Sequence, residues 1–383
     1  MSNQSLINSN LTSSLEPPSL DQLLDSLGFD LWKTILATFI IPATSFIGII
    51  FCSLSAWIFF QKNFKDPVFF YYRLLCIVYI IHLIHNMPYG LLFSPRYIPQ
   101  MNTYLSSFYL IYFTNVSALL FHFEETIQMA ILLTRMKIFS PFVERHFKAR
   151  PWVISLSFFL TCLFINSFSA LGLKIDSLGT YSYIDSSNSI KHTSTFFYFN
   201  ASDFVLTLWG QIISGFTGII LNLLLSIIIG VILNIFSVHL YRSYVRERRE
   251  KDKEYTRVKY HTNKDQNQST TSLDEIQVVV VSKVNKLTQK EINENKSEKN
   301  MFFMALTLCS ISILSRVLII FSYVLFIFFN TFSNSLSVYI INIGLYSFAP
   351  SVAIFVFYLF NKMFREEFRE KFFKKGKKEM QQK

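Results

Sequence analysis

Long apolar stretches separated by polar segments dominate the pattern along the chain. A helix needs about 20 apolar residues to cross a bilayer. Seven stretches reach that length, at 34–60, 68–93, 108–134, 152–173, 205–240, 301–329 and 337–360. A helix also pairs its own backbone polar groups, as the hydrocarbon core requires. The pattern therefore predicts an all-α membrane protein, with a seven-transmembrane helix bundle over residues 34–360.

Two long polar segments flank or interrupt this bundle. Residues 1–33 are rich in Ser, Asn and Asp and lack the apolar core of a cleavable signal peptide, so we expect the first span to act as the insertion signal. Residues 241–300 open with a charged continuation of the fifth helix and then become polar and mixed in charge. Too few of these residues could form a core, which predicts a long disordered loop.

The segment after the last span, 361–383, has a helical pattern of its own. Phe364, Phe368 and Phe372 recur every four residues and so share one face of a helix, while Arg, Lys and Glu occupy the other positions. This pattern predicts a short amphipathic helix that lies in the membrane interface, followed by a basic tail.

Composition and charge agree with a membrane protein and orient it. Hydrophobic residues make up 51% of the chain and charged residues only 16%. The net charge of +11 could suggest nucleic-acid binding, but it is divided unequally between the two sides of the predicted bundle. The connections after the first, third and fifth helices and the tail carry +14, and the opposite segments carry −3. The positive-inside rule then places the basic side in the cytoplasm and the amino terminus outside, without a nucleic-acid partner.

Two other residue types are less informative. Asn3, Asn10 and Asn200 begin glycosylation sequons on the predicted outer side, although two further sequons lie on the inner side. The four cysteines all fall inside predicted helices, where we expect small buried side chains. No Cys/His spacing fits a metal site, and we expect no cofactor and no outer disulfide.

Four charged residues lie in the predicted spans, where ionisable groups are costly. Arg73 lies near enough to the cytoplasmic end of its span to reach the interface, so three candidates for function are left. Glu124 and Glu125 lie in the third span, and Arg316 lies at a comparable depth in the sixth. An ion pair between Arg316 and one acid would remove most of the cost of both charges. We expect the second acid to be protonated or hydrogen-bonded, and three roles stay open for the cluster: a fixed strut, an activation switch or a ligand counter-ion.

Further polar residues lie at similar depth. They are the histidines His82, His85 and His122, and Gln128, one turn after Glu124. The histidines are candidate partners of the second acid; all four could line a ligand pocket or simply pack with hydrogen bonds. The chain has no nucleophile and base pair, zinc-binding helix or glycine-rich phosphate loop, so an enzyme is not expected.

Fragments of family motifs occur at the ends of two spans. Leu133-Thr134-Arg135-Met136 resembles the acid-Arg-aromatic triplet of the rhodopsin-like G-protein-coupled receptors, and Ser140-Pro141-Phe142 resembles the proline turn that follows it. Tyr358, followed by Phe364-Arg365, resembles the tyrosine of the last span and the opening of the eighth helix. The whole membrane region is similar in style to invertebrate orphan or chemosensory-type receptors.

The chain departs from that family at several positions. Thr134 replaces the acid of the triplet, Ile354-Phe355 replaces the Asn-Pro pair before the tyrosine, and Gly48-Ile49 replaces the Gly-Asn of the first span. The Cys pair that ties the third helix to the second outer loop is also missing.

The resemblance implies a plasma-membrane receptor that senses an extracellular ligand and signals through a heterotrimeric G protein. Its implied coupling surface consists of Arg135, Lys137, Pro141, Arg242, Arg246 and Tyr358. Two other functions stay open. A seven-helix ion channel or transporter would place Glu124, Glu125 and Arg316 on an ion path, and a scaffold would use only the 241–300 loop and the tail.

Overall fold

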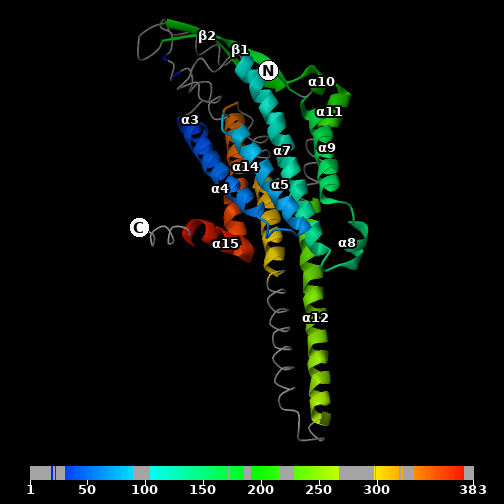
Figure 1. Cartoon of the computed structure of the whole chain (residues 1–383). Helices are drawn as coiled ribbons and strands as arrows, with labels where there is room; N and C mark the ends of the chain where they lie inside the picture. The colour runs from blue at the N-terminus through cyan, green and yellow to red at the C-terminus, as the bar shows by residue number, and fades with distance from the viewer. Residues whose placement is uncertain are drawn as a thin grey trace, which may run out of the picture.

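A computed structural model gives the fold, which is mostly helical (Figure 1). The structure describes residues 19, 22, 31–88, 104–170, 173–184, 191–215, 228–266, 297, 299–318, 321 and 332–374.

The described elements follow the order of the chain. The first helices are α3 (Leu31–Ile35), η1 (Leu36–Ile40), α4 (Ile41–Phe59), α5 (Pro67–Asn86), α7 (Tyr104–Met136), α8 (Pro141–His146) and α9 (Pro151–Ala170). Next come the strands β1 (Leu173–Ile184) and β2 (Lys191–Ala201), then the helices α10 (Asp203–Leu206), α11 (Leu208–Gly215) and α12 (Gly230–Gln266). The chain ends with the helix Lys299–Leu318, α14 (Phe332–Phe360), α15 (Lys362–Arg369) and η4 (Glu370–Lys374).

Four described helices are long and apolar enough to cross a membrane: Leu36–Phe59, Pro67–Asn86, Asn115–Met136 and Lys299–Leu318. A fifth is possible if Ser347–Phe360 and Lys362–Phe372, which meet at a bend of 97°, count as one span. These helices confirm the membrane-protein class, and they match five of the predicted stretches.

The count of seven spans stays a prediction. The apolar helix Pro151–Ser167 within α9 is shorter than a membrane span. The predicted span 205–240 includes residues 216–227, which lie outside the described part.

The expectation of an all-helical chain is wrong for the segment after α9. Strands β1 and β2 pair antiparallel from Leu173↔Ala201 to Ile184↔Lys191, with an irregularity between Ser177 and Gly179. The segment is rich in Thr, Tyr and Phe, which favour strands, and it lies beyond the apolar stretch of α9. The hairpin contacts α7 and lies at one end of the bundle, which we call the hairpin end; the opposite end is the α15 end (Figure 1).

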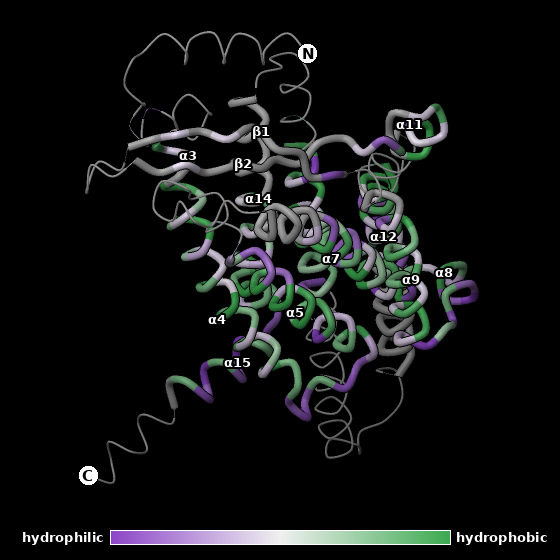
Figure 2. The backbone as a smooth tube through the Cα atoms, turned by 90° about the horizontal axis from the view of Figure 1, so that it is seen from above, coloured by the Kyte–Doolittle hydropathy of each residue, from purple (hydrophilic) through white to green (hydrophobic). Residues whose placement is uncertain are grey.

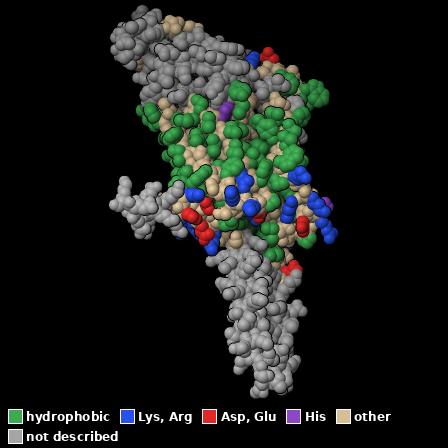
Figure 3. All heavy atoms as spheres, viewed as in Figure 1, with side chains coloured by type: hydrophobic (Ala, Val, Ile, Leu, Met, Phe, Trp, Pro, Cys, Tyr) green, Lys and Arg blue, Asp and Glu red, His purple; other side chains and the backbone are tan. Residues whose placement is uncertain are grey.

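The surface of the bundle has the distribution expected of a protein in a lipid bilayer. Hydrophobic side chains cover its middle, and Lys and Arg side chains gather in a band near the α15 end (Figure 3). Large apolar side chains such as Phe46, Phe164 and Leu359 are more than half exposed. In water such a surface would be an aggregation liability, whereas lipid covers it at no cost.

Helix α12 extends far past the rest of the bundle at the α15 end (Figure 1). It continues to Gln266, so the first part of the predicted loop 241–300 is helical. Its charged half is rich in Arg, Lys and Glu, which are good helix formers. The predicted disorder further along falls on residues 267–296, which lie outside the described part.

Helix α15 is docked on the bundle by its aromatic face. The Asn361 side chain accepts a hydrogen bond from the Phe364 backbone N–H and so caps the helix start. Phe364 is fully buried against Phe59 and Phe357, whereas Phe368 contacts Tyr358 edge-on and Phe372 contacts Trp57 edge-on. The predicted amphipathic helix therefore exists, but its phenylalanine face packs mainly on protein.

Seen along the bundle, α7 occupies a central position (Figure 2). It contacts α5, α9 and α12 directly. Side chains that project from α7 therefore reach several neighbouring helices.

Candidate functional site

Two adjacent acids in α7 organise the buried polar groups of the bundle. Neighbouring residues of an α-helix point about 100° apart. Glu124 therefore faces α5, whereas Glu125 faces the helix Lys299–Leu318. Both side chains are buried, so each needs a partner.

Glu125 forms a bidentate ion pair with Arg316. Arg316 Nε donates to Glu125 Oε1 and Nη2 donates to Oε2, both at 2.7 Å. Parallel N–H···O bonds of this kind are the strongest carboxylate–guanidinium arrangement. The structure thus forms the predicted pair, and it selects Glu125 rather than Glu124 as the partner.

Aromatic and polar groups surround the Arg316 guanidinium. Its carbon lies 3.9 Å from the centre of the Phe121 ring, within the range of a cation–π contact. Its Nη1 lies 3.5 Å from His122 Nε2, and Asn166 Nδ2 lies 3.1 Å from His122 Nδ1. Sequence reasoning missed Phe121 and Asn166, although Asn166 is the one amide side chain in the predicted span 152–173.

Glu124 pairs with His82 on α5. His82 Nδ1 lies 2.6 Å from Glu124 Oε1, and both side chains are buried. The structure thus selects His82 among the three histidines as the partner of the second acid. His85 lies in the last turn of α5 and is half-buried.

Gln128 lies one turn further along α7, and its amide nitrogen forms a hydrogen bond to α5. Its Nε2 donates to the Tyr79 hydroxyl at 2.8 Å. Its Oε1 is buried and has no hydrogen-bond partner among the described residues. Tyr79 was not predicted as part of the site, although it lies three residues before His82 and so on the same face of α5.

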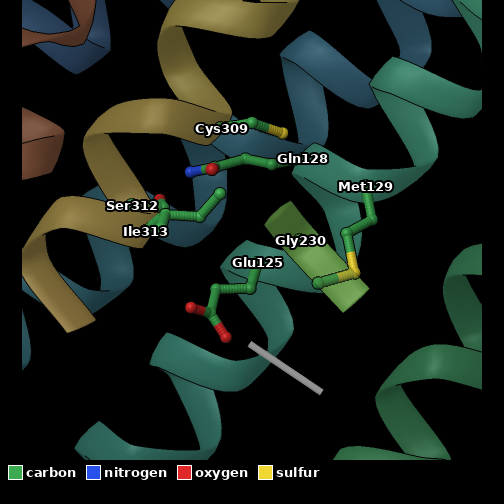
Figure 4. A pocket seen from close by; sticks show the side chains of 7 residues that line it. All are labelled: Glu125, Gln128, Met129, Gly230, Cys309, Ser312 and Ile313. Carbon is green, nitrogen blue, oxygen red and sulfur yellow. The ribbon is translucent and has the colours of Figure 1, made fainter. Parts of the chain in front are cut away.

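A small pocket, with room for about one water molecule, adjoins Glu125 and Gln128 (Figure 4). It lies between α7, α12 and the helix Lys299–Leu318. Besides the two α7 residues it is lined by Met129, Gly230, Cys309, Ser312 and Ile313.

A second buried network connects four helices near the Asn86 end of α5. Ser117 Oγ donates to Asn86 Oδ1 at 3.0 Å, and Asn86 Nδ2 donates to Ser347 Oγ at 3.3 Å. Ser45 Oγ donates to Ser347 Oγ at 3.4 Å. These bonds join α7, α5, α14 and α4, and the serines had not been singled out from the sequence.

Arg135 ends α7 as a nearly buried cation. It is 5% exposed, and its Nη1 lies 3.6 Å from Asp66 Oδ2. The other oxygen of Asp66 accepts from the Val68 backbone N–H and caps α5, which begins with Pro67. Thr134, which precedes Arg135, has no carboxylate, and Asp66 at the start of α5 provides one instead. In the sequence, the Asp66-Pro67 pair indicates the start of a helix, but it does not indicate a partner for Arg135.

The other predicted coupling residues lie at the same end. The Lys137 ammonium lies 4.8 Å from the centre of the Phe147 ring; partial burial lowers the Lys137 pKa, against the opposing effect of Glu144. Pro141 begins α8 and is exposed. Tyr358 accepts from Arg369 Nε at 3.2 Å, and the Arg242 and Arg246 side chains are exposed on α12.

Of the three predicted glycosylation positions, the structure describes Asn200. Asn200 lies in β2 opposite Lys174. Asn3 and Asn10 lie outside the described residues.

The helices and the buried charges together define a helical membrane protein with a polar centre. Within the described residues, no group of three or more His, Cys, Asp and Glu side chains could hold a metal ion. The chain matches no known protein-family model, and comparison with curated proteins finds no significant match.

Proposed function

We propose that the protein is a G-protein-coupled receptor of the plasma membrane, with its amino terminus outside and the α15 end in the cytoplasm. It senses an extracellular ligand and signals through a heterotrimeric G protein. Support for the orientation comes from the basic band near the α15 end (Figure 3).

The observation that carries the proposal is the state of Arg135. A nearly buried guanidinium with one ion pair at 3.6 Å is not fully satisfied, and its Nε has no hydrogen-bond partner among the described residues. The carboxylate of that pair belongs to Asp66, whose side chain is 48% exposed. Such a cation is suited to release Asp66 and to bind acceptor groups of a G protein.

The charge cluster offers a route from ligand to G protein. Glu125 and Arg135 lie on the same helix, about 15 Å apart. A ligand that binds better when the helix Lys299–Leu318 has shifted against α7 would stabilise the shifted arrangement. The shift would open the α15 end next to Arg135, Lys137 and α12.

The testing experiment measures G-protein activation in cells that express the full chain. We expect Arg135→Ala to lower activation roughly tenfold at equal surface expression, within the usual range of coupling between sites. Asp66→Asn should instead raise basal activation, because the neutral amide holds Arg135 less strongly.

Arg150→Ala is the matched control, because Arg150 is an exposed cation near the same end. It should change activation little. Identical signalling by the wild type and Arg135→Ala would contradict the proposal. A membrane current independent of G proteins would support the channel alternative instead.

A further inference from the structure

We propose that the Pro151 end of α9 binds one phospholipid with a negatively charged headgroup, in the leaflet at the α15 end. The headgroup lies against the cations Arg145 and Lys148, and the acyl chains lie along an exposed apolar face of α9. The inference rests on the membrane class of the protein and not on the proposed receptor function.

The exposed face of α9 has the length of one leaflet. Four large apolar side chains at helical spacing are roughly half exposed on it: Trp152, Leu156, Leu160 and Leu163. From Trp152 to Leu163 the helix rises by about 16 Å, which is close to half of the roughly 30 Å of a hydrocarbon core. This face therefore matches the acyl chains of a lipid in a single leaflet.

The opposite face of α9 fixes the rotation of the helix. Ile154, Cys162 and Asn166 are buried on that face, and α9 contacts α7. The Asn166 amide nitrogen also lies 3.1 Å from His122 Nδ1 on α7. These contacts hold Trp152 and the three leucines toward the lipid.

A basic segment adjoins the Trp152 end of this face. Residues 137–150 contain four cations and one acid, Glu144, and so carry a net charge of +3. Arg145, in the last turn of α8, and Lys148 are exposed, and neither has an ion-pair partner among the described residues. Lys148 is separated from Trp152 by at most about 14 Å of extended chain, and α8 lies beside this end of α9 (Figures 1 and 2). With Trp152 at the membrane interface, both cations lie at the depth of the headgroups.

The apolar face and the cations together select an anionic lipid. An acidic soluble protein could bind the cations, but it could not cover the side chains from Trp152 to Leu163, which lie in the hydrocarbon core. A lipid without net charge could cover the apolar face, but it would leave Arg145 and Lys148 without a counter-charge. A phospholipid with a negative headgroup satisfies both parts of the surface.

Another part of the basic end lacks this combination and provides a control. Lys62 and Lys65 are exposed in the connection between α4 and α5. The nearby Trp57 of α4 is in contact with η4: its ring centre lies 5.9 Å from that of Phe372, and Lys371 Nζ lies 5.9 Å from the Trp57 ring centre. Protein therefore covers part of the apolar surface near Lys62 and Lys65.

The test measures which lipid touches Trp152, using the purified full chain in lipid nanodiscs. The substitutions Trp32→Phe, Trp57→Phe and Trp209→Phe leave Trp152 as the one fluorescent tryptophan. Brominated acyl chains quench tryptophan on contact, so brominated phosphatidylserine is compared with brominated phosphatidylcholine at the same low fraction. Each Lys or Arg near an anionic surface strengthens binding by about fivefold. We expect the serine lipid to be favoured at Trp152 on the order of tenfold after screening by salt.

Two double variants of this chain separate the site from the overall basic charge. Arg145→Gln with Lys148→Gln should remove most of the preference for the serine lipid. Lys62→Gln with Lys65→Gln, which removes the same charge elsewhere, should keep it. Equal quenching by the two lipids in the parent chain would overturn the proposal, as would an equal preference in the two double variants.

A second measurement applies if the chain with one tryptophan does not fold. Native mass spectrometry then counts the phosphatidylserine molecules that the wild type and the two double variants retain from mixed nanodiscs. Loss of a retained lipid in the Arg145 and Lys148 variant alone supports the site, and any other pattern contradicts it. Neither measurement involves a G protein, so a failed Arg135 experiment would not change the lipid preference.

Discussion

Helix α7 is packed differently on its two sides. Toward α5, Glu124 is bonded to His82 and Gln128 to Tyr79, with ring contacts and apolar packing filling the rest of the interface. Toward α12 and the helix Lys299–Leu318, Glu125 accepts two hydrogen bonds from Arg316, and a small pocket lies next to that pair.

Two glycines on these sides show the same contrast. A Cβ added at Gly48, in α4, would lie 2.5 Å from Ser351 Oγ and 2.8 Å from Leu83 Cδ1, which is too close without movement. A Cβ at Gly230 would meet its nearest neighbour at 3.3 Å. We call the α4–α5–α14 side the frame: it is packed more closely at Gly48 than the α12 side is at Gly230, where a small shift of Ile313 would accommodate the added methyl group. Because close-packed interfaces resist small displacements, we expect conformational change to concentrate on the α12 side.

The largest expected effect comes from breaking the ion pair that joins the two sides. Arg316→Ala leaves the Glu125 carboxylate buried without its partner, which costs about 3–5 kcal/mol of unfolding free energy. We expect a large loss of folded protein at the cell surface, measured by surface labelling of intact cells.

A double variant identifies charge as the cause. Glu125→Gln together with Arg316→Met removes both charges and should recover part of the surface expression. The matched variant Glu124→Gln with Arg316→Met should recover less, because Glu124 is bonded to His82 instead. Normal expression and signalling of Arg316→Ala alone would show that the pair does not hold the helices together.

A smaller effect is expected from filling the glycine of the frame. Gly48→Ala forces Ser351 or Leu83 to move, and overpacking of this kind costs about 1–3 kcal/mol. Gly344→Ala is the matched control, since a Cβ there would have no neighbour within 4 Å among the described residues. The control should be neutral or stabilising by roughly 0.5–1 kcal/mol, because alanine favours the helix. Both are measured as unfolding midpoints in detergent, and equal midpoints would mean that the frame is not close-packed at Gly48.

Elements whose structure depends only on their own residues could be predicted from the sequence. The apolar stretches of α4, α5 and the helix Lys299–Leu318 could be predicted from their length and composition. The regular spacing of Phe residues predicted the helix α15. The hairpin of β1 and β2 was missed, although its Thr, Tyr and Phe residues favour strands, because the pairing of two segments is not visible in either segment alone. The contact of Phe364 with the bundle was missed because the pattern defines a helix face but not what covers it.

The site was predictable as a set of residues but not as a set of pairs. The cost of charge in a bilayer identified Glu124, Glu125 and Arg316 directly from their positions. The choice of Glu125 for Arg316 and of His82 for Glu124 depends on how α7 is rotated in the bundle, which one sequence does not specify. Asp66 was missed as a partner of Arg135 because its position before Pro67 already explained it as a helix cap.

We expect the smallest effect from a change in the polar network at Asn86, which tests whether the frame extends to that network. Ser117→Ala removes the donor to Asn86, and such interhelical bonds in membrane proteins average about 0.6 kcal/mol. Ser315→Ala is the matched control on the other side, since the Ser315 hydroxyl donates to the Ile311 carbonyl of its own helix. Losing that bond should cost nothing measurable, because a serine that bonds back to its own helix adds little stability. A lower unfolding midpoint for Ser117→Ala than for Ser315→Ala would extend the frame from Gly48 to Asn86. The reverse order would place the stabilising contacts on the α12 side, and the contrast between the two sides of α7 would then be wrong.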